Sequence, residues 1–64
     1  MLKCWLTIDK NGIEHIWQFK PIKEADYWTA STGQYMPLPY GSIEKVTGVK
    51  LDWEIAMFYE QNLK

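Results

Sequence analysis

The stretch LPYGSIEKVTGVKLDWE, residues 38–54, is the part of the chain in which the start, body and end of an element can all be read. Pro39 keeps the approach out of a helix, and the Ser42 hydroxyl can accept a hydrogen bond from the free backbone N–H groups of the next turn, as an N-cap does. Gly48 can adopt the left-handed conformation that closes a helix. The stretch therefore predicts a helix over residues 43–47, capped by Ser42 and too short to be stable without packing.

After Gly48 the spacing of apolar residues changes from that of a helix to every second residue. Every odd position from 49 to 59 is apolar, which predicts a strand over residues 49–59 with its odd side chains buried. The alternative is a helix that begins at Asp52 and runs to Gln61. That helix would carry Glu60 on its apolar side, so we favour the strand.

The N-terminal third predicts a β-hairpin. Residues 2–8 and 13–20 alternate apolar and polar side chains, and Asn11-Gly12 between them is a strong hairpin signal. A two-residue loop there collects one apolar face, with the pairs Ile8–His15, Leu6–Trp17 and Cys4–Phe19. The alternative is a type I turn with Gly12 as a bulge, which sets Ile8 against Glu14; hydrophobic sorting favours the first register.

The remaining segments predict connections and an edge strand. Pro21 ends the second strand, and residues 22–33 are interpreted as a connection anchored by Tyr27-Trp28. Residues 35–38 can form a short strand, which Pro37 restricts to a sheet edge. The predicted fold is a single α+β domain over residues 1–64: a small, mostly antiparallel sheet, made of an N-terminal hairpin plus a C-terminal strand, with one short helix.

Composition excludes several classes of partner. The net charge is −1 and all seven basic residues are lysines, so a nucleic-acid surface built on arginine forks is disfavoured. The single cysteine, Cys4, cannot form an internal disulfide, and we interpret it as a small apolar filler in a strand. No signal peptide or membrane-spanning run is evident, which predicts a cytoplasmic protein without a membrane partner.

No pattern indicates catalysis. His15 is the only imidazole, and on the apolar face of a hairpin it is expected to be a hydrogen-bonded structural histidine. Asp52 and Glu54 share the polar face of the predicted last strand, where solvated carboxylates are the simpler interpretation. Neither metal-ligand spacing nor a phosphate-binding loop is present. We therefore expect no catalytic residue, no cofactor and no metal.

Aromatic residues are the remaining signal. The predicted faces assign Trp17, Phe19, Trp53 and Tyr59 to the core and leave Trp5, Ile16 and Phe58 on the opposite face. Either the connection over residues 22–33 covers that face or it is an interaction surface. The candidate partner-binding residues are Trp5, Ile16, Trp28, Tyr35 and Phe58.

The order of motifs resembles small uncharacterised hypothetical proteins of phages and mobile elements of gut bacteria. The resemblance covers most of the chain up to Glu54, after which those proteins close with acidic residues and a proline whereas this chain stays apolar through residues 55–59. The shared elements are Asn11-Gly12, Lys20-Pro21-Ile22, Tyr27-Trp28, Leu38 to Lys45, Gly48 and Leu51-Asp52-Trp53-Glu54.

This resemblance implies a phage-like genomic setting and no catalytic residue. Together with the aromatic candidates, it predicts a small non-catalytic protein-binding module that is phage-encoded and acts on a host protein. The alternative is a self-associating, homodimeric structural protein joined through the unpaired edge of the last strand.

Overall fold

A computed structural model describes residues 2–61 and places them in two antiparallel sheets and one helix. The larger sheet has the strand order β5-β2-β1-β6, and the smaller one pairs β3 with β4. The predicted α+β class, with a mostly antiparallel sheet and one short helix, is confirmed. The elements are β1 (Leu2–Ile8), β2 (Glu14–Trp17), β3 (Ile22–Lys23), β4 (Trp28–Thr29), β5 (Tyr35–Leu38), α1 (Ser42–Thr47) and β6 (Met57–Gln61).

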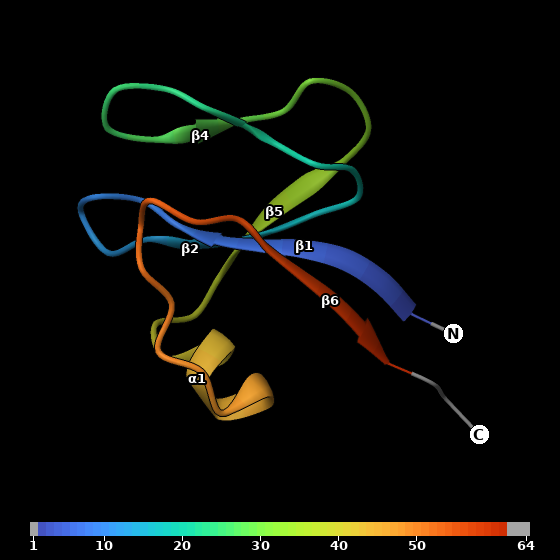
Figure 1. Ribbon diagram of the computed structural model, residues 1–64, viewed down its shortest axis with the longest axis vertical. Coiled ribbons are helices and arrows are strands. Elements are labelled where there is room, and N and C mark those ends of the chain that lie inside the picture. The colour runs from blue at the N-terminus through green and yellow to red at the C-terminus, as the bar shows by residue number, and fades with distance from the viewer. Residues whose placement is uncertain (1, 62–64) are drawn as a thin grey trace.

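Helix α1 lies on one face of the larger sheet and the smaller sheet lies over part of the other face, so the molecule has three layers. Figure 1 shows the smaller sheet above the larger one and α1 below it. On the α1 side, Cys4, Leu6 and Ile43 form a buried aliphatic core. On the other side, Thr7 and Trp17 are fully buried beneath the segment that carries Trp28.

The hairpin between β1 and β2 takes the bulged register. Asp9 N–H donates to the Ile13 carbonyl at 2.8 Å, and Gly12 N–H donates to the Asp9 carbonyl at 2.9 Å. Among the turn residues 9–13 only Gly12 has a positive φ, of 94°. Ile8 therefore lies opposite Glu14, and the favoured two-residue loop is wrong. Sorting apolar residues onto one face misled the prediction because both faces of this sheet hold buried residues, Cys4 and Leu6 on one and Trp17 on the other.

Gly12→Val is expected to destabilise the protein by about 1–3 kcal/mol, because a β-branched residue is strained at positive φ. A Cβ at Gly12 meets no atom within 4 Å, so the penalty comes from the backbone alone. Gly12→Asn is the matched control, since Asn tolerates positive φ, and it should cost clearly less. Urea unfolding measures both; a Val variant as stable as the parent would contradict the turn assignment.

Helix α1 ends where the sequence predicts but begins differently. Gly48 adopts φ 76° and its N–H donates to the Glu44 carbonyl at 2.8 Å, which confirms the predicted stop. Ser42 is the first helical residue and not the cap, because its hydroxyl donates to the Pro39 carbonyl at 2.5 Å. The N-cap residue is Gly41, which has no side chain to offer the free N–H groups.

A carboxylate from the sheet supplies the missing cap. Glu14 Oε2 accepts from Gly41 N–H at 2.6 Å and Glu14 Oε1 accepts from Ile43 N–H at 2.8 Å. The Glu14 residue is only 5% exposed, and its charge lies at the end of the helix where the dipole favours an anion. The short helix is thus fixed to β2 by two charge-assisted hydrogen bonds.

The long C-terminal strand predicted over residues 49–59 is wrong for its first eight residues, and the alternative helix from Asp52 does not form either. Asp52 interrupts the run: its carbonyl accepts from Ile55 N–H at 3.1 Å and its side chain accepts from Glu54 N–H at 3.2 Å. Only residues 57–61 lie beside β1, so only they can form a ladder. Alternation without a neighbouring strand is therefore insufficient.

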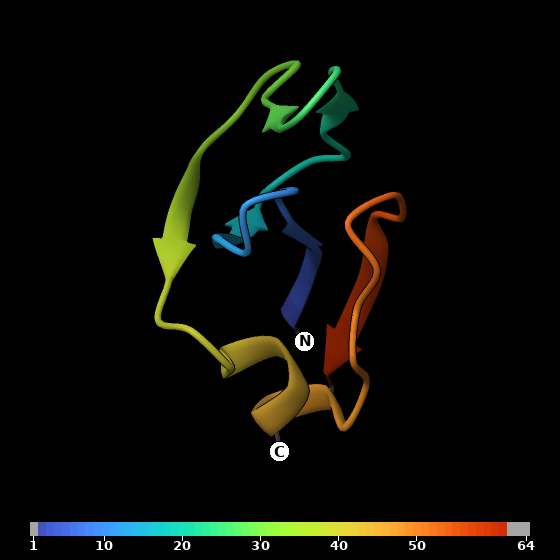
Figure 2. The same cartoon turned by 90° about the vertical axis from the view of Figure 1, so that its left-hand side faces the viewer.

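The connection over residues 22–33 is more ordered than predicted. It forms the β3–β4 pair, and of the predicted Tyr27-Trp28 anchor only Trp28 is buried, because Tyr27 is exposed. The predicted edge strand over residues 35–38 is confirmed as β5, with Pro37 in its interior. Figure 2 shows β5 and β6 at opposite sides of the larger sheet.

Candidate functional site

Four aromatic side chains cross the larger sheet from one edge to the other. Trp17 lies opposite both Trp5 on β1 and Tyr35 on β5, and Phe58 on β6 lies opposite Trp5. Residues directly opposite one another in an antiparallel sheet project from the same face, here the face away from α1. We call Tyr35, Trp17, Trp5 and Phe58 the aromatic row.

The middle of the aromatic row belongs to the core. Trp17 is 2% exposed, and its indole Nε1–H donates to Thr7 Oγ1 at 2.7 Å. Its ring stacks on that of Tyr35 with centroids 4.7 Å apart and planes inclined at 21°. Trp5 and Phe58 form a second pair with centroids 5.2 Å apart and a tilt of 60°. Such offset and tilted pairs contribute beyond their buried area.

The β3–β4 segment packs beside the row and leaves its ends open. Trp28 is buried. Its backbone N–H donates to Asp9 Oδ1 at 3.1 Å, and its indole Nε1–H donates to the Trp53 carbonyl at 2.9 Å. At the ends of the row, Phe58 is 49% exposed and Tyr35 is 55% exposed. The row therefore has a structural centre and two accessible ends.

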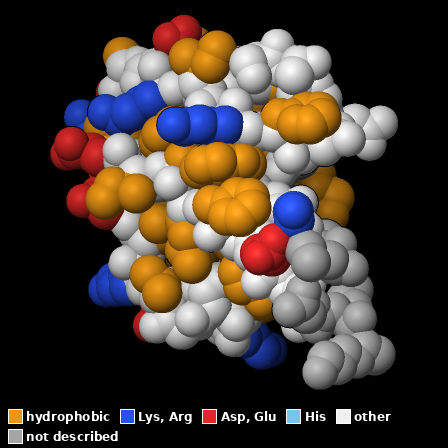
Figure 3. Space-filling view, turned by 45° about the vertical axis from the view of Figure 1, so that its right-hand side comes forward, with side chains coloured by type: hydrophobic (Ala, Val, Ile, Leu, Met, Phe, Trp, Pro, Cys, Tyr) orange, Lys and Arg blue, Asp and Glu red, His pale blue; other side chains and the backbone are white. Residues whose placement is uncertain are grey.

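Charged side chains border the β6 end of the row. Lys20 Nζ lies 5.5 Å from the Trp5 ring centroid, within the range of a cation–π contact. Lys3 Nζ lies 3.6 Å from a carboxylate oxygen of Glu60. Figure 3 shows a patch of hydrophobic side chains on this side of the molecule, with a lysine lying across it and an acidic and a basic group together at its margin. An apolar centre with a charged rim is typical of protein-binding surfaces.

The two edge strands of the larger sheet differ in how their outer backbone groups are protected. Gln18 N–H donates to the Gln34 carbonyl at 2.9 Å, so the backbone groups of alternate residues 34, 36 and 38 point to β2 and Pro37 lies on the outer edge. Proline has no N–H and denies that edge a donor, which is a common protection against strand pairing.

The outer edge of β6 has no proline. Because Asp9 N–H donates to the Ile13 carbonyl, the backbone N–H and C=O groups of the odd-numbered residues of β1 point toward β2. Those of its even-numbered residues point toward β6, where they pair with Met57, Tyr59 and Gln61. The N–H and C=O groups of Phe58 and Glu60 therefore point outward. Within residues 2–61 no strand pairs with them.

Three of the five predicted partner-binding residues lie together. Trp5, Tyr35 and Phe58 are all members of the aromatic row. Ile16 projects from the opposite face and packs on the aliphatic core, so its predicted placement with Trp5 and Phe58 is wrong. Trp28 lies on the same side as the row, but it is buried and its indole N–H is hydrogen-bonded to the Trp53 carbonyl.

Sequence reasoning missed Lys20 and Glu60 as members of this surface. The bulged hairpin register, had it been preferred, would have set Trp5 beside Trp17 and revealed the first half of the row. The position of Lys20 over Trp5 depends on the chain path after β2, which no periodicity specifies. Glu60 becomes an edge residue only because β6 pairs with β1.

The titratable side chains of the described residues do not form a nucleophile–base pair. His15 Nδ1 lies 3.9 Å from Asp9 Oδ2, beyond hydrogen-bond distance, and it has no hydrogen-bond partner among residues 2–61, contrary to the expected hydrogen-bonded histidine. Cys4 is buried as predicted, and this burial raises the pKa of its thiol. A thiol with a raised pKa stays protonated near neutral pH and is a weak nucleophile.

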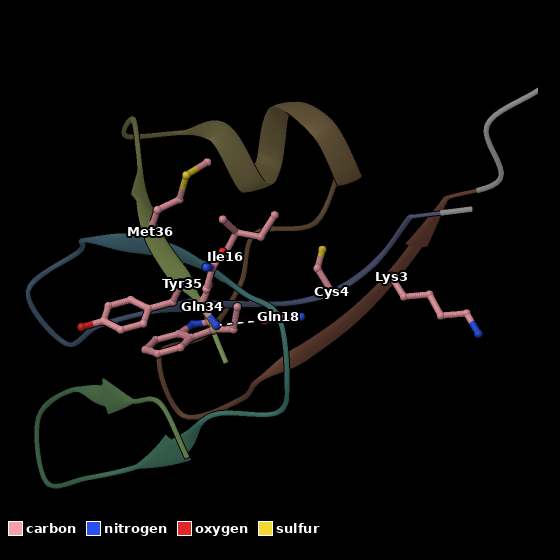
Figure 4. A pocket seen from close by; sticks show the side chains of 8 residues that line it. Lys3, Cys4, Ile16, Gln18, Gln34, Tyr35 and Met36 are labelled. Atoms are coloured by element: carbon pink, nitrogen blue, oxygen red, sulfur yellow. Dashed lines mark hydrogen bonds between the residues drawn. The ribbon is translucent and has the colours of Figure 1, made fainter. Parts of the chain in front are cut away.

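A shallow depression of about 300 Å³ lies where β1, β2 and β5 meet. Its polar groups are already engaged, since Gln34 N–H donates to Gln18 Oε1 at 3.0 Å. Figure 4 shows that the Tyr35 and Cys4 side chains point in different directions and that Lys3 extends away from the others. The depression thus brings no reactive groups together.

Comparison with known proteins gives no match: no protein-family model matches the chain, and no curated protein or solved structure is significantly similar to it. Within residues 2–61, no three His, Cys, Asp or Glu side chains gather where they could share a metal ion. The same residues contain no helix with the length and apolar character needed to span a membrane.

Proposed function

We propose that this protein is a small, non-catalytic protein-binding module that holds its partner at the β6 end of the aromatic row. The observation that carries the proposal is Phe58, a half-exposed aromatic ring on an unprotected edge strand. Aromatic anchors at the centre of a patch dominate the energetics of protein interfaces. Trp5 packs against Phe58 from the neighbouring strand, and Lys20 and the Lys3–Glu60 pair form the polar rim.

The partner we propose is a protein of a bacterial host. The resemblance to small proteins of phages and mobile elements supports a phage-encoded chain that acts on such a host protein. The buried, reduced Cys4 is consistent with a cytoplasmic setting for both. Self-association is the second candidate function, and the open backbone edge of β6 favours it.

Affinity capture from the host lysate tests the proposed surface. Phe58→Asp should abolish capture, because it places an unpaired charge in an apolar contact, while the melting temperature of the dilute variant stays near that of the parent. Tyr35→Asp is the matched control: this ring is equally exposed, at 55% against 49% for Phe58, but lies at the proline-protected edge, so capture should persist.

Two results would contradict the proposal. If Phe58→Asp captures the same proteins as the parent, the β6 end of the row is not the binding surface. If Phe58→Asp lowers the melting temperature as strongly as a core substitution, Phe58 is part of the fold and the surface must be withdrawn.

A further inference from the structure

We infer that, when no other partner is bound, the outer edge of β6 pairs antiparallel with β6 of a second copy of this chain, with the two-fold axis at Phe58. The two larger sheets would then join into one continuous antiparallel sheet. This inference rests on the proposed function for its surface, and it names a second copy as the occupant.

The backbone argument starts from the two outward residues of β6. A C2 interface is self-complementary, so an antiparallel strand pair can place a residue opposite its own copy. With the axis at Phe58, this residue exchanges both its N–H and its C=O bond with the partner's Phe58, as a hydrogen-bonded antiparallel pair does. Glu60 then lies opposite the partner's Ala56.

Two other axes are less favourable. An axis at Glu60 sets two carboxylates directly opposite each other, which is destabilising in a sheet. An axis at Tyr59 sets Phe58 against the partner's Glu60, so each exposed ring meets a charge. Only the axis at Phe58 keeps the carboxylates apart and brings the two exposed rings together.

Side chains support the same axis. The Phe58 ring already packs on Trp5 within its own copy, with the ring centroids 5.2 Å apart. A contact between the two Phe58 rings would extend the aromatic row from one copy into the next. The charges nearest the edge are balanced within each copy, because Lys3 pairs with Glu60 at 3.6 Å. No like charge is therefore buried between the copies.

The size of the surface predicts a reversible dimer. A standard interface buries about 800 Å² of each partner, a large share of the 4692 Å² that this chain exposes. A five-residue strand with one aromatic anchor lies at the lower end of interface sizes. Dimerisation should consequently depend on protein concentration.

The opposite edge cannot offer the same pairing, because Pro37 removes an outward donor from β5.

Sedimentation velocity tests the inference between about 1 μM and about 1 mM protein. The parent should move from the 7.6 kDa mass of the chain toward twice that mass. Phe58→Asp should weaken dimerisation by about a hundredfold or more, because a charge would face its own copy in an apolar contact. Glu60→Pro should also weaken dimerisation, because it removes an outward backbone N–H that makes no hydrogen bond to β1. Glu60→Ala is the control: it keeps this N–H and should still dimerise.

Amide hydrogen exchange gives a readout that needs no substitution. Protection of the Phe58 and Glu60 amides should increase with protein concentration, while that of Tyr35 on the opposite edge should not change. A chain that stays monomeric throughout the range would overturn the inference, and so would a dimer that persists in Phe58→Asp but dissociates in Tyr35→Asp.

Failure of the dimer and failure of the proposed function give different results. A monomeric parent whose host-protein capture is lost in Phe58→Asp refutes the dimer and keeps the binding module. A dimer that dissociates in Phe58→Asp, together with capture that the substitution does not change, supports the dimer and refutes the host-binding surface.

Discussion

Trp17→Ala is expected to cost about 3–5 kcal/mol of stability, the range for removing a large aromatic side chain from a packed core. The Trp17 residue is 2% exposed and stacks on Tyr35 at 4.7 Å, so truncation leaves a cavity between the two layers. A 64-residue domain has a total stability of roughly 3–10 kcal/mol. We therefore expect the variant to be largely unfolded at 37 °C by circular dichroism.

A double-mutant cycle separates the packing of Trp17 from its hydrogen bond to Thr7. Thr7→Val leaves the indole N–H buried without a partner and should cost about 1–3 kcal/mol. Trp17→Phe combined with Thr7→Val removes both polar groups, so the pair should lose less than the sum of the two single changes. Additive losses would show that the 2.7 Å contact contributes nothing specific.

Glu14→Ala is expected to cost about 3 kcal/mol, because two charge-assisted hydrogen bonds of about 1.5–3 kcal/mol each are lost and two amides at the helix start are left without their acceptor. Glu14 is the only described side chain that accepts from Gly41 or Ile43 N–H. A six-residue helix cannot form by itself, so α1 should detach from the sheet. Chemical denaturation and the amide shifts of residues 41–47 measure both effects.

Two further substitutions show whether the position of the carboxylate matters. Glu14→Gln keeps the shape but offers one acceptor oxygen for two N–H groups, so it should lose about half of the stabilisation. Glu44→Ala removes an exposed carboxylate from the first turn of the same helix and should cost less than about 0.5 kcal/mol. If Glu14→Ala and Glu44→Ala were equally mild, the cap assignment would fail.

The aromatic row was only partly predictable. Trp5, Tyr35 and Phe58 are among the predicted partner-binding residues, but apolar sorting on one face favours a hairpin register that does not align Trp5 with Trp17. Sorting fails here because the second face also holds a buried residue, Trp17, next to the β3–β4 segment that carries Trp28. A short polar connection gives little sequence evidence that it forms a layer.

Features that depend on the backbone chemistry of a single residue can be predicted from the sequence. Gly12 places the hairpin turn, Gly48 ends α1, and Pro37 confines β5 to an edge, because positive φ and a missing N–H are properties of the residue wherever it lies. The alternation of residues 2–8 likewise predicted β1.

Which distant side chains and backbone groups contact one another across the sheet depends on the tertiary structure. Glu14 caps a helix 27 residues further along the chain, and β6 begins only at Met57, opposite Leu6, although β1 continues to Ile8. These choices depend on hydrogen bonds and contacts between distant segments, whose energies exceed the local preferences that a sequence displays. Periodicity cannot encode them, because it describes neighbours along the chain and not neighbours in space.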